Sequence, residues 1–405
     1  MPAPIDAMPG TITAGTPSLL RAINERSVLE LVRRHSPISR AYIARESGLS
    51  KPTVSLALSG LLEGGLVREV GRSRGGRGPT AVLYEVNPSA GWVVGIDVGR
   101  QWVRAAIANI SGAIVARRQE RAQVRSADSL IGQIGSIAHQ LAAEAGIRWN
   151  QVTAATLGSP GVFDPERGVM LMAPNLPGWG RQGLVEAVRR ELGTSVTFEN
   201  DVNLAAIGEG AHGHGREVGN FVYLSVGTGV GAGLVLRGSL HRGAGGGAGE
   251  IGYLPIGHQD GPPASRRWGA FEEATAAAGV VRAAKGFGMK GPLTAERVFL
   301  AARRGDPAAT RAVAIEATRL ATAIATLTLV LDPELVVLGG GIGRNGDLLI
   351  DPIERELRHL PFRPRLLVSA LGEDAVLQGA VATALEAARD RVFARPGRLL
   401  QEAAG

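Results

Sequence analysis

A short segment at residues 95–104, with the sequence GIDVGRQWVR, opens like a loop that binds phosphate. An apolar strand runs into Asp97 and Gly99, and a glycine at such a turn lets backbone amides approach an anion closely. The turn then continues with three large residues: Arg100, Gln101 and Trp102. Because these side chains occupy the space that a phosphate needs, we expect a structural hairpin that does not handle a nucleotide well.

A second candidate for chemistry is the segment ENDVN at 199–203, where a predicted strand meets a predicted helix. The carboxylates and amides of this segment suit a sugar, because sugar hydroxyls both donate and accept hydrogen bonds in fixed geometry. Asn200 and Asp201 are the residues of interest. The alternative is that they only cap the helix, which is the usual role of Asn and Asp at a helix start. We favour contact with a ligand.

The chain around these segments has the pattern of a packed α/β protein. From Trp92 onward, short β-rich runs such as WVVGIDV and ELVVLGGG alternate with longer Ala-rich amphipathic stretches, as in an α/β fold. The run VGTGVGAG at 226–233 either wraps a phosphate or forms a tight hairpin with small residues for packing. Residues 1–18 are rich in Pro, Gly, Thr and Ala without periodicity, so we expect a flexible tail there.

Residues 36–86 predict a helix, a tight turn and a second helix. Ser39 is a suitable N-cap for the first helix, and Gly48 suits the left-handed residue that follows a helix end. Ser50 can cap the second helix, with Pro52 in its first turn. Four apolar residues fall on one face of this second helix: Val54, Leu58, Leu61 and Leu62. That face packs inward and leaves four residues exposed near the start of the helix: Lys51, Thr53, Ser55 and Leu56.

The exposed start of the second helix is of the kind that a recognition helix presents to DNA bases. Two short β-runs, 66–70 and 81–86, follow and enclose a Gly-rich segment with three arginines. Such a hairpin suits phosphates or a narrow minor groove, because glycine lets the backbone approach and arginine adds charge. We expect these residues to contact DNA: Arg40, Lys51, Thr53, Ser55, Arg72, Arg74 and Arg77. The alternative is a protein-interaction module whose arginines are merely solvated.

Charge and composition exclude several classes of protein. Residues 19–85 carry 11 Arg or Lys against 6 Asp or Glu, while residues 86–405 carry 33 against 30. The positive excess therefore lies at the N-terminal end, which favours DNA binding there. The absence of cysteine excludes disulfides and thiolate metal sites. The best apolar run, 320–331, is too short to span a bilayer, and the N-terminus has no signal-peptide pattern, so we expect a cytoplasmic protein.

Seven motifs, taken in order, carry a resemblance to a known family. They are GSPG at 158–161, APNLPGW at 173–179, ENDVN at 199–203, VGTGVGAG at 226–233, GAGEIGY at 247–253, RWGAFEE at 267–273 and VVLGGGIG at 336–343. In this order, behind a winged helix, they resemble the ROK family of sugar-responsive repressors and sugar kinases. The order and spacing of several motifs make the resemblance more specific than a single Gly-rich loop.

The resemblance implies a winged helix-turn-helix at 19–87, followed at 92–405 by a two-lobed, actin-like α/β fold of the sugar kinase type. The lobes are expected at about 92–205 and 206–405, and the C-terminal helix either stays with the second lobe or returns to the first. Sugar is expected between the lobes. The residues that the resemblance assigns to sugar binding are Asn175, Asn200, Asp201, Glu250, Tyr253 and Glu272.

Two departures from the family pattern change the expected function. The kinases of the family have a loop resembling DIGGTK where this chain has its three large residues. Asp201 stands where those kinases place a catalytic base, and we interpret it as a vestige that binds a sugar hydroxyl. Many members hold a structural zinc through a His and several Cys. Here the His position is Tyr253, and His258 with Asp260 is too little for tetrahedral zinc, so we expect neither zinc nor ATP as a cofactor.

These observations predict a homodimeric or homotetrameric transcription regulator, most simply a repressor that a small carbohydrate effector releases from double-stranded operator DNA. Two alternatives remain open. One is an ATP-dependent sugar kinase with an added DNA-binding domain. The other is a regulator whose ligand is a partner protein, with the cleft between the lobes vestigial.

Overall fold

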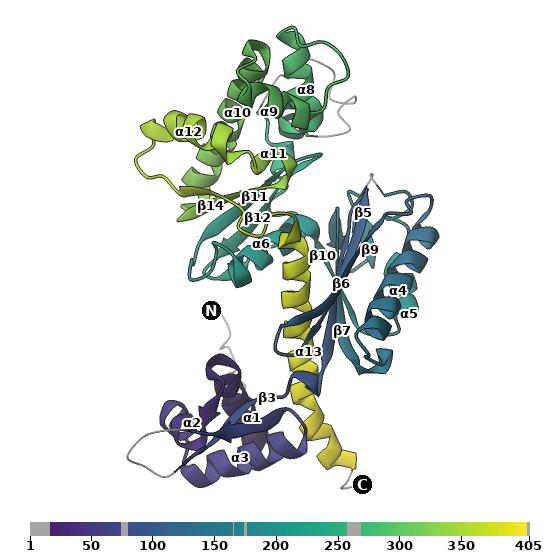
Figure 1. Cartoon of the computed structure of the whole chain (residues 1–405), viewed down its shortest axis with the longest axis vertical. Helices are drawn as coiled ribbons and strands as arrows, with labels where there is room; N and C mark the ends of the chain where they lie inside the picture. The colour runs from purple at the N-terminus through teal and green to yellow at the C-terminus, as the bar shows by residue number, and fades with distance from the viewer. Residues whose placement is uncertain (1–16, 74–79, 165, 174–175, 257–268, 403–405) are drawn as a thin grey trace, which may run out of the picture. The chain divides into compact units, whose positions relative to one another are not determined.

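The computed structural model describes residues 17–73, 80–164, 166–173, 176–256 and 269–402 of the 405-residue chain (Figure 1). The chain divides into two compact units. The first unit comprises Met1–Trp92, Asn109–Ala113 and Ala388–Gly405. The second unit comprises Val93–Ala108 and Ile114–Ala387.

The C-terminal segment 388–405 and the turn 109–113 are part of the first unit, although the sequence placed all of 92–405 in the second domain. The reason is packing. Ile110 and Arg389 line one small hollow of the first unit together with Leu29 and Val86. Three distant parts of the chain therefore contribute to the N-terminal unit.

The first unit is built from three helices and a small sheet. Its helices are α1 (Pro17–His35), α2 (Arg40–Ser47) and α3 (Lys51–Glu63). Its strands are β1 (Ile38–Ser39), β2 (Val67–Arg72) and β3 (Val82–Val86), hydrogen-bonded in the order β1-β3-β2. Helix α1 begins at Pro17, so residues 17–18 of the expected tail are helical, while residues 1–16 lie outside the described residues. The core includes Val28, Ile43, Leu58 and Tyr84.

The capping residues predicted from the sequence are found at both helices that flank the turn. The Ser39 side chain accepts from the Tyr42 amide, and Gly48 has a φ of 69° in the left-handed region. The Ser50 side chain accepts a hydrogen bond of 3.2 Å from the Thr53 amide. The predicted helix, tight turn and helix are confirmed, because capping depends on residues close together in sequence.

The second unit contains two five-stranded sheets. The first sheet has the order β10-β7-β4-β5-β6, and α4 and α5 cover one of its faces (Figure 1). Its elements, with the short ones beside them, are β4 (Trp92–Val98), β5 (Trp102–Asn109), β6 (Ile114–Arg121), α4 (Ala127–Glu144), η2 (Trp149–Gln151), β7 (Val152–Ser159), β8 (Val162–Asp164), β9 (Val169–Leu171), α5 (Leu184–Leu192) and β10 (Val196–Asn200). The short helix η1 (Pro88–Ala90), just before β4, belongs to the first unit. Strands β8 and β9 pair as a separate antiparallel ribbon.

The second sheet has the order β13-β12-β11-β14-β15. Its strands are β11 (Phe221–Val226), β12 (Val230–Leu236), β13 (Ser239–Leu240), β14 (Leu335–Gly339) and β15 (Arg365–Val368). The helical segments around it are η3 (Ile251–Tyr253), α7 (Ala270–Thr275), α8 (Ala277–Gly286), α9 (Ala295–Arg303), α10 (Pro307–Leu331), α11 (Gly340–Gly343), α12 (Gly346–Glu356), η5 (Leu357–His359) and η6 (Gly372–Asp374). Along β11, Val222 and Leu224 face a core that contains Ile324 of α10, whereas Phe221 and Tyr223 face the other core, as the alternation of a strand requires.

Helix α10 is long and apolar enough, by length and composition alone, to cross a membrane. Half of its most apolar 18-residue stretch is buried inside the protein. Its buried side includes Leu320, Ile324 and Leu327 in the core against the second sheet. A core helix of a large α/β unit passes the same test as a membrane span, because both are apolar around much of their circumference.

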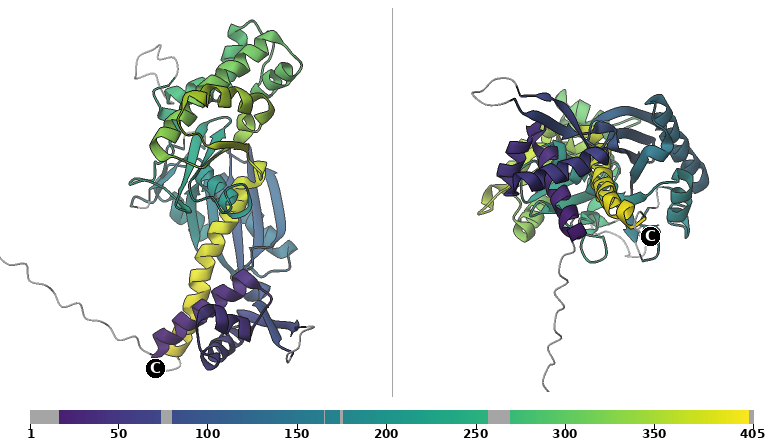
Figure 2. Two further views of the ribbon diagram at one scale, coloured as in Figure 1. Left: turned by 90° about the vertical axis from the view of Figure 1, so that its left-hand side faces the viewer. Right: turned by 90° about the horizontal axis from the view of Figure 1, so that it is seen from below.

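Two helices, α6 (Asp201–His212) and α13 (Ala375–Glu402), pack against each other at backbone distance. A Cβ on Gly379 of α13 would lie 1.8 Å from the Leu204 carbonyl oxygen of α6. A Cβ on Gly95 of β4 would likewise lie 2.8 Å from the Val381 amide nitrogen of α13. Figure 2 shows α13 as one continuous helix. Its first half is therefore fixed to the strand and the helix that carry the candidate site.

Candidate functional site

The predicted hairpin at residues 95–104 is present. Strands β4 and β5 are neighbours in the sheet, and the Gly99 amide donates to the Trp102 carbonyl at 2.9 Å. Arg100 and Gln101 are exposed at the turn. The guanidinium of Arg121 on β6 lies over the Trp102 ring, with its Cζ 4.2 Å from the centre of the ring. The turn is thus closed by its own backbone and held by a cation–π contact to the next strand.

The buried Asp97 at the end of β4 has a cationic partner on the next strand. Its Oδ2 accepts a hydrogen bond of 3.1 Å from Nη1 of Arg104 on β5. Nε of Arg104 donates to Gln119 at 3.1 Å, and Nη2 donates to Glu373 at 3.0 Å. Burial raises the pKa of Asp97 to about 6, even though Arg104 acts to lower it. The negative charge of Asp201 adds to the increase.

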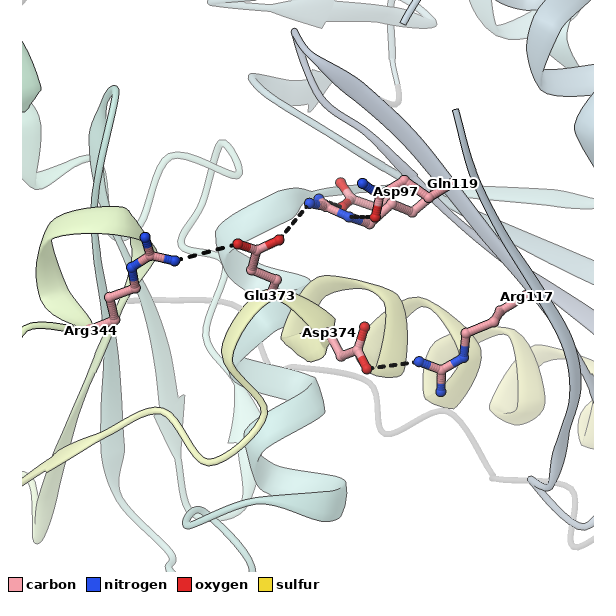
Figure 3. A network of polar contacts seen from close by, with 7 residues as sticks. Asp97, Arg117, Gln119, Arg344, Glu373 and Asp374 are labelled. Carbon is pink, nitrogen blue, oxygen red and sulfur yellow. Dashed lines mark hydrogen bonds and ion pairs between the residues drawn. The ribbon is translucent and has the colours of Figure 1, made fainter. Parts of the chain in front are cut away.

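The acidic pair Glu373 and Asp374, just before α13, is bound by arginines from three elements (Figure 3). One carboxylate oxygen of Glu373 accepts from Arg104 of β5, and the other accepts from Arg344, which follows α11, at 3.5 Å. Asp374 accepts from Arg117 of β6 at 3.0 Å. Residues of the first sheet and of the second-sheet region therefore meet at the start of one helix.

The start of α6 is capped by Asn200. Its Oδ1 accepts from the amides of Val202 at 2.8 Å and Asn203 at 3.1 Å, and its Nδ2 donates to the Gly161 carbonyl at 3.0 Å. The cap role that was the alternative in the sequence is therefore observed. Most of the hydrogen-bonding capacity of the Asn200 side chain is used by the protein itself, which leaves one amide hydrogen for a ligand.

Three carboxyls expected at a sugar site are electrostatically coupled. The pKa of Asp201 is raised to about 6, chiefly by burial; the Val202 amide acts to lower it, and the charge of Glu250 acts to raise it. The pKa of Glu250 is raised by burial and by Glu272, and that of Glu272 is raised by burial. Oε2 of Glu272 accepts from the Val230 amide at 2.9 Å, at the end of the turn between β11 and β12. The structure thus brings Asp201, Glu250 and Glu272 into one electrostatic group.

Sequence reasoning missed the neighbour of this group, Glu199. This buried residue accepts from Asn203 Nδ2 at 2.9 Å and from Arg242 Nε at 2.7 Å. Arg242 follows β13, so the contact joins two segments 43 residues apart. Glu199 itself is part of the ENDVN motif, but nothing in the sequence near Arg242 predicts that it pairs with Glu199. The pair fixes the strand end from which Asn200 and Asp201 project.

Only some of the residues predicted to contact sugar, DNA or metal lie in the part of the chain that the structure describes. Tyr253, at the end of η3, has 55% of its surface exposed. Asn175 lies outside the described residues, as do Arg74 and Arg77 and the pair His258 and Asp260. Within the described ranges, no group of three or more His, Asp or Glu is arranged to hold a metal ion.

The remaining DNA-contact candidates gather at the start of α3, apart from Arg72, which is exposed at the end of β2. Arg40 at the start of α2 donates to Ser55 Oγ and to the Tyr84 hydroxyl, both at 3.2 Å. Thr53 shares a hydrogen bond of 2.8 Å with Ser50, and Lys51 is exposed. Leu56, which the sequence also places at the exposed start of this helix, has 56% of its surface exposed.

Comparison with known proteins defines the class. A match to the ROK family covers residues 93–387, and the chain belongs to that family. It is 28% identical over 388 residues to the xylose repressor of Caldicellulosiruptor bescii, with 91% of this chain and 96% of that protein covered. It is 30% identical over 309 residues to a glucokinase of Halalkalibacterium halodurans, with 71% and 93% covered.

Two solved structures give the same picture of the fold. A ROK family transcriptional regulator, described as a homolog of the E. coli MLC protein, aligns with a TM-score of 0.78 at 22% identity and covers 93% of this chain and 98% of its own. The ROK hexokinase from Thermus thermophilus aligns with a TM-score of 0.62 at 31% identity and covers 74% of this chain and 99% of its own. The two regulators therefore match more of this chain than the two kinases do.

Proposed function

We propose that this protein is a sugar-responsive transcription regulator, a cytoplasmic repressor that a carbohydrate effector releases from operator DNA. The observation that carries the proposal is the presence, in one chain of the ROK family, of a helix–turn–helix with a β-hairpin ahead of the ROK region. The near full-length match to a protein named as a xylose repressor supports it.

The DNA-binding part of the proposal assigns the first unit as a winged helix-turn-helix. Helix α3 enters the major groove and the β2–β3 hairpin forms the wing. The exposed Lys51 neutralises a phosphate, whereas Thr53 and Ser55 lie where a recognition helix contacts bases. Arg72, Arg74 and Arg77 of the wing contact the backbone or the minor groove. A homodimer then reads two half-sites, which would make the operator palindromic.

The sugar-binding part assigns Asn200, Asp201, Glu250 and Glu272 to the hydroxyls of the effector, with Asn175 and Tyr253 completing the site. Carboxylates with raised pKa values are costly for the protein to keep buried. Hydrogen bonds from sugar hydroxyls would offset that cost, because a donor stabilises the charged carboxylate. Such a site gains affinity for its ligand because the buried carboxylates lack hydrogen-bond donors in the free protein and receive them from the sugar.

The protein does not transfer phosphate in this proposal. The turn after Asp97 is closed by its own backbone and held beside a tryptophan. Asp97 is paired with a guanidinium, and a fixed positive charge there repels the divalent cation that phosphoryl transfer uses. The Val230 amide, which follows the glycine-rich turn, is already bound to Glu272. The kinases among the relatives give the alternative, a sugar kinase with an added DNA-binding domain.

Helix α13 supplies the coupling between sugar and DNA in this proposal. Its first turn follows the Glu373–Asp374 pair, and its residues from Ala388 onward belong to the first unit. A sugar that changes how the two sheet regions close would displace this helix. To move the protein from about 99% bound to about 99% released, the sugar must prefer the released form by about 10⁴-fold, or about 5.5 kcal/mol.

The experiment is fluorescence anisotropy of the full-length protein on its own upstream DNA at fixed salt, with and without a panel that includes xylose and glucose. We expect specific binding that one sugar releases. A sugar that binds tightly by calorimetry and leaves the affinity for DNA unchanged would overturn the mechanism. Turnover in a nucleotide-release assay, abolished by Asp201→Ala, would instead establish the kinase. Operator binding without response to any sugar would favour a partner protein as the ligand.

A further inference from the structure

A hollow of about 550 Å³ opens where α12 ends and β15 begins. Strands β14 and β15 are parallel, so the chain returns along α12 to the level at which both strands start. This crossover brings the last turn of α12, η5 and the segment before β15 together around the hollow. Six charged residues line it: Asp351, Glu354, Arg355, Arg358, Arg363 and Arg365. None of them is assigned to sugar or DNA, so the hollow has no role in the proposed function.

The four arginines of the hollow are exposed and lack carboxylate partners. In the part of the chain that the structure describes, none of them forms an ion pair. Arg355 alone among the four has a side-chain hydrogen bond there, from its Nε to the Asp351 carbonyl at 3.3 Å. Arginines elsewhere in the same unit, such as Arg117 and Arg303, are each paired with an aspartate. The guanidinium groups around the hollow therefore keep most of their N–H donors free for a ligand.

The end of a helix is one ordinary reason for such charges. The last carbonyls of a helix carry partial negative charge, which favours Arg355 at the end of α12 and Arg358 in η5. That reason does not apply to Arg363 and Arg365, which lie beyond both helices and approach the hollow from the start of β15. Arg363 also lies between the two prolines of the segment 361–364. Because proline restricts the backbone, less conformational freedom is lost when this arginine binds a ligand.

The mixture of charges indicates the kind of ligand. The planar guanidinium group matches the oxygens of a phosphate, and a phosphate with two negative charges can bind several arginines at once. Asp351 and Glu354 in the same hollow repel a bare anion but accept hydrogen bonds from hydroxyl groups. The volume lies within the range of small-molecule sites, about 300–1,000 Å³.

We propose that this hollow binds a small phosphate ester that carries free hydroxyl groups. The arginines hold the phosphate, and the two carboxylates accept from the hydroxyls. The ligand would be a second one, bound by residues that take no part in the sugar site. The proposal does not depend on the protein being a repressor, because neither sugar nor DNA is assigned to these residues.

The test is isothermal titration of the full-length protein with glycerol 3-phosphate and ribose 5-phosphate, each beside its uncharged parent, and with inorganic phosphate. We expect at least one ester to bind with a Kd below about 1 mM. Its parent and inorganic phosphate should bind at least about 10-fold more weakly. The double variant Arg358→Gln with Arg363→Gln should weaken ester binding at least about 10-fold. The matched control, Arg189→Gln with Arg190→Gln, removes the same charge from two exposed residues of α5 and leaves the affinity unchanged.

Several results would overturn the proposal. If neither ester binds, or if inorganic phosphate binds as tightly as the esters, the ligand class is wrong. Ester binding that survives the loss of Arg358 and Arg363 but disappears in Asp201→Asn would place the ester in the sugar site. An equal loss in the α5 control would show that only the net charge matters. Operator binding is measured in parallel, and if it weakens in the Arg358 and Arg363 variant while no ester binds, the arginines contact DNA instead.

Discussion

Arg104 and Asp97 form an ion pair across the β4–β5 hairpin, with Nη1 and Oδ2 3.1 Å apart and both side chains largely buried. The pair lies where a nucleotide loop was considered from the sequence, and it gives the hairpin a structural role of its own. The same guanidinium also donates to Glu373, which lies 269 residues further along the chain. One side chain therefore joins the end of β4 to the start of α13.

Replacing Arg104 by alanine is expected to lower the free energy of unfolding by about 3 kcal/mol at pH 7.5, because a buried carboxylate loses its cation. The loss should shrink toward pH 5. The pKa of Asp97 is already raised to about 6, and without Arg104 it rises further, so the lone carboxyl is neutral at the lower pH. Urea denaturation at both pH values measures this. The control is Arg117→Ala, whose exposed pair with Asp374 should contribute less than about 1 kcal/mol. Equal losses for the two variants would contradict the assignment.

Asp201→Asn is expected to stabilise the sugar-free protein while abolishing its response to sugar. The folded pKa of Asp201 is about 6, above its ordinary value of 3.8, so the folded state binds the proton more tightly than the unfolded chain does. Stability of the wild type therefore falls as pH rises from about 4 through about 6, and asparagine does not share that loss. Thermal unfolding should show a gain of about 1–3 kcal/mol at pH 7.5 and almost none at pH 4. If the variant is less stable than the wild type, the role of Asp201 is purely structural.

Asn200→Ala tests whether the residue serves the helix as well as the ligand. The change removes two accepted hydrogen bonds at the start of α6 and one donated to Gly161. We expect a loss of about 2 kcal/mol in unfolding free energy. Ser126→Ala, which removes a single capping bond from α4, should lose about 1 kcal/mol. Wild-type stability together with lost sugar binding would show that Asn200 serves the ligand alone.

Lys51→Ala should weaken DNA binding at all sequences and reduce the magnitude of the slope of log affinity against log salt by about 1, because one phosphate contact is removed. Thr53→Ala should instead change the preferred operator sequence with little change in slope. Anisotropy titrations at four salt concentrations separate the two effects. Lys290→Ala, an exposed lysine of the second unit, is the control. If Lys290→Ala behaves like Lys51→Ala, the placement of α3 in the groove is wrong.

The parts of the fold that the sequence predicted well are those set by neighbours in the chain. Ser39 and Ser50 cap helix starts through amides three residues away, and Gly48 ends a helix in the left-handed conformation. Likewise, an apolar run that ends at a glycine predicts the turn between β4 and β5. The boundary of the units was harder, because the packing of Arg389 beside Leu29 depends on how distant parts of the chain fold together.

The sequence named candidate site residues but not the contacts between them. Glu250 and Glu272 were named through motifs, and the structure adds that the charge of Glu272 raises the pKa of Glu250. The pairing of Glu199 with Arg242 and the hydrogen bond from the Val230 amide to Glu272 each join segments more than 40 residues apart in the chain, so both depend on the tertiary fold. Spacing in sequence does not encode such contacts, whereas capping and strand alternation are encoded locally.

The contribution of α13 to the N-terminal unit has a consequence for biosynthesis. Ala388 is fully buried, and Arg389 lines a hollow beside Leu29, which the ribosome releases some 360 residues earlier. The first unit therefore cannot acquire its complete packing until α13 has emerged from the ribosome. A nascent or truncated chain without α13 would lack that packing, so operator binding would be delayed until α13 has been synthesised, and copies that lack α13 would be poor competitors for the operator.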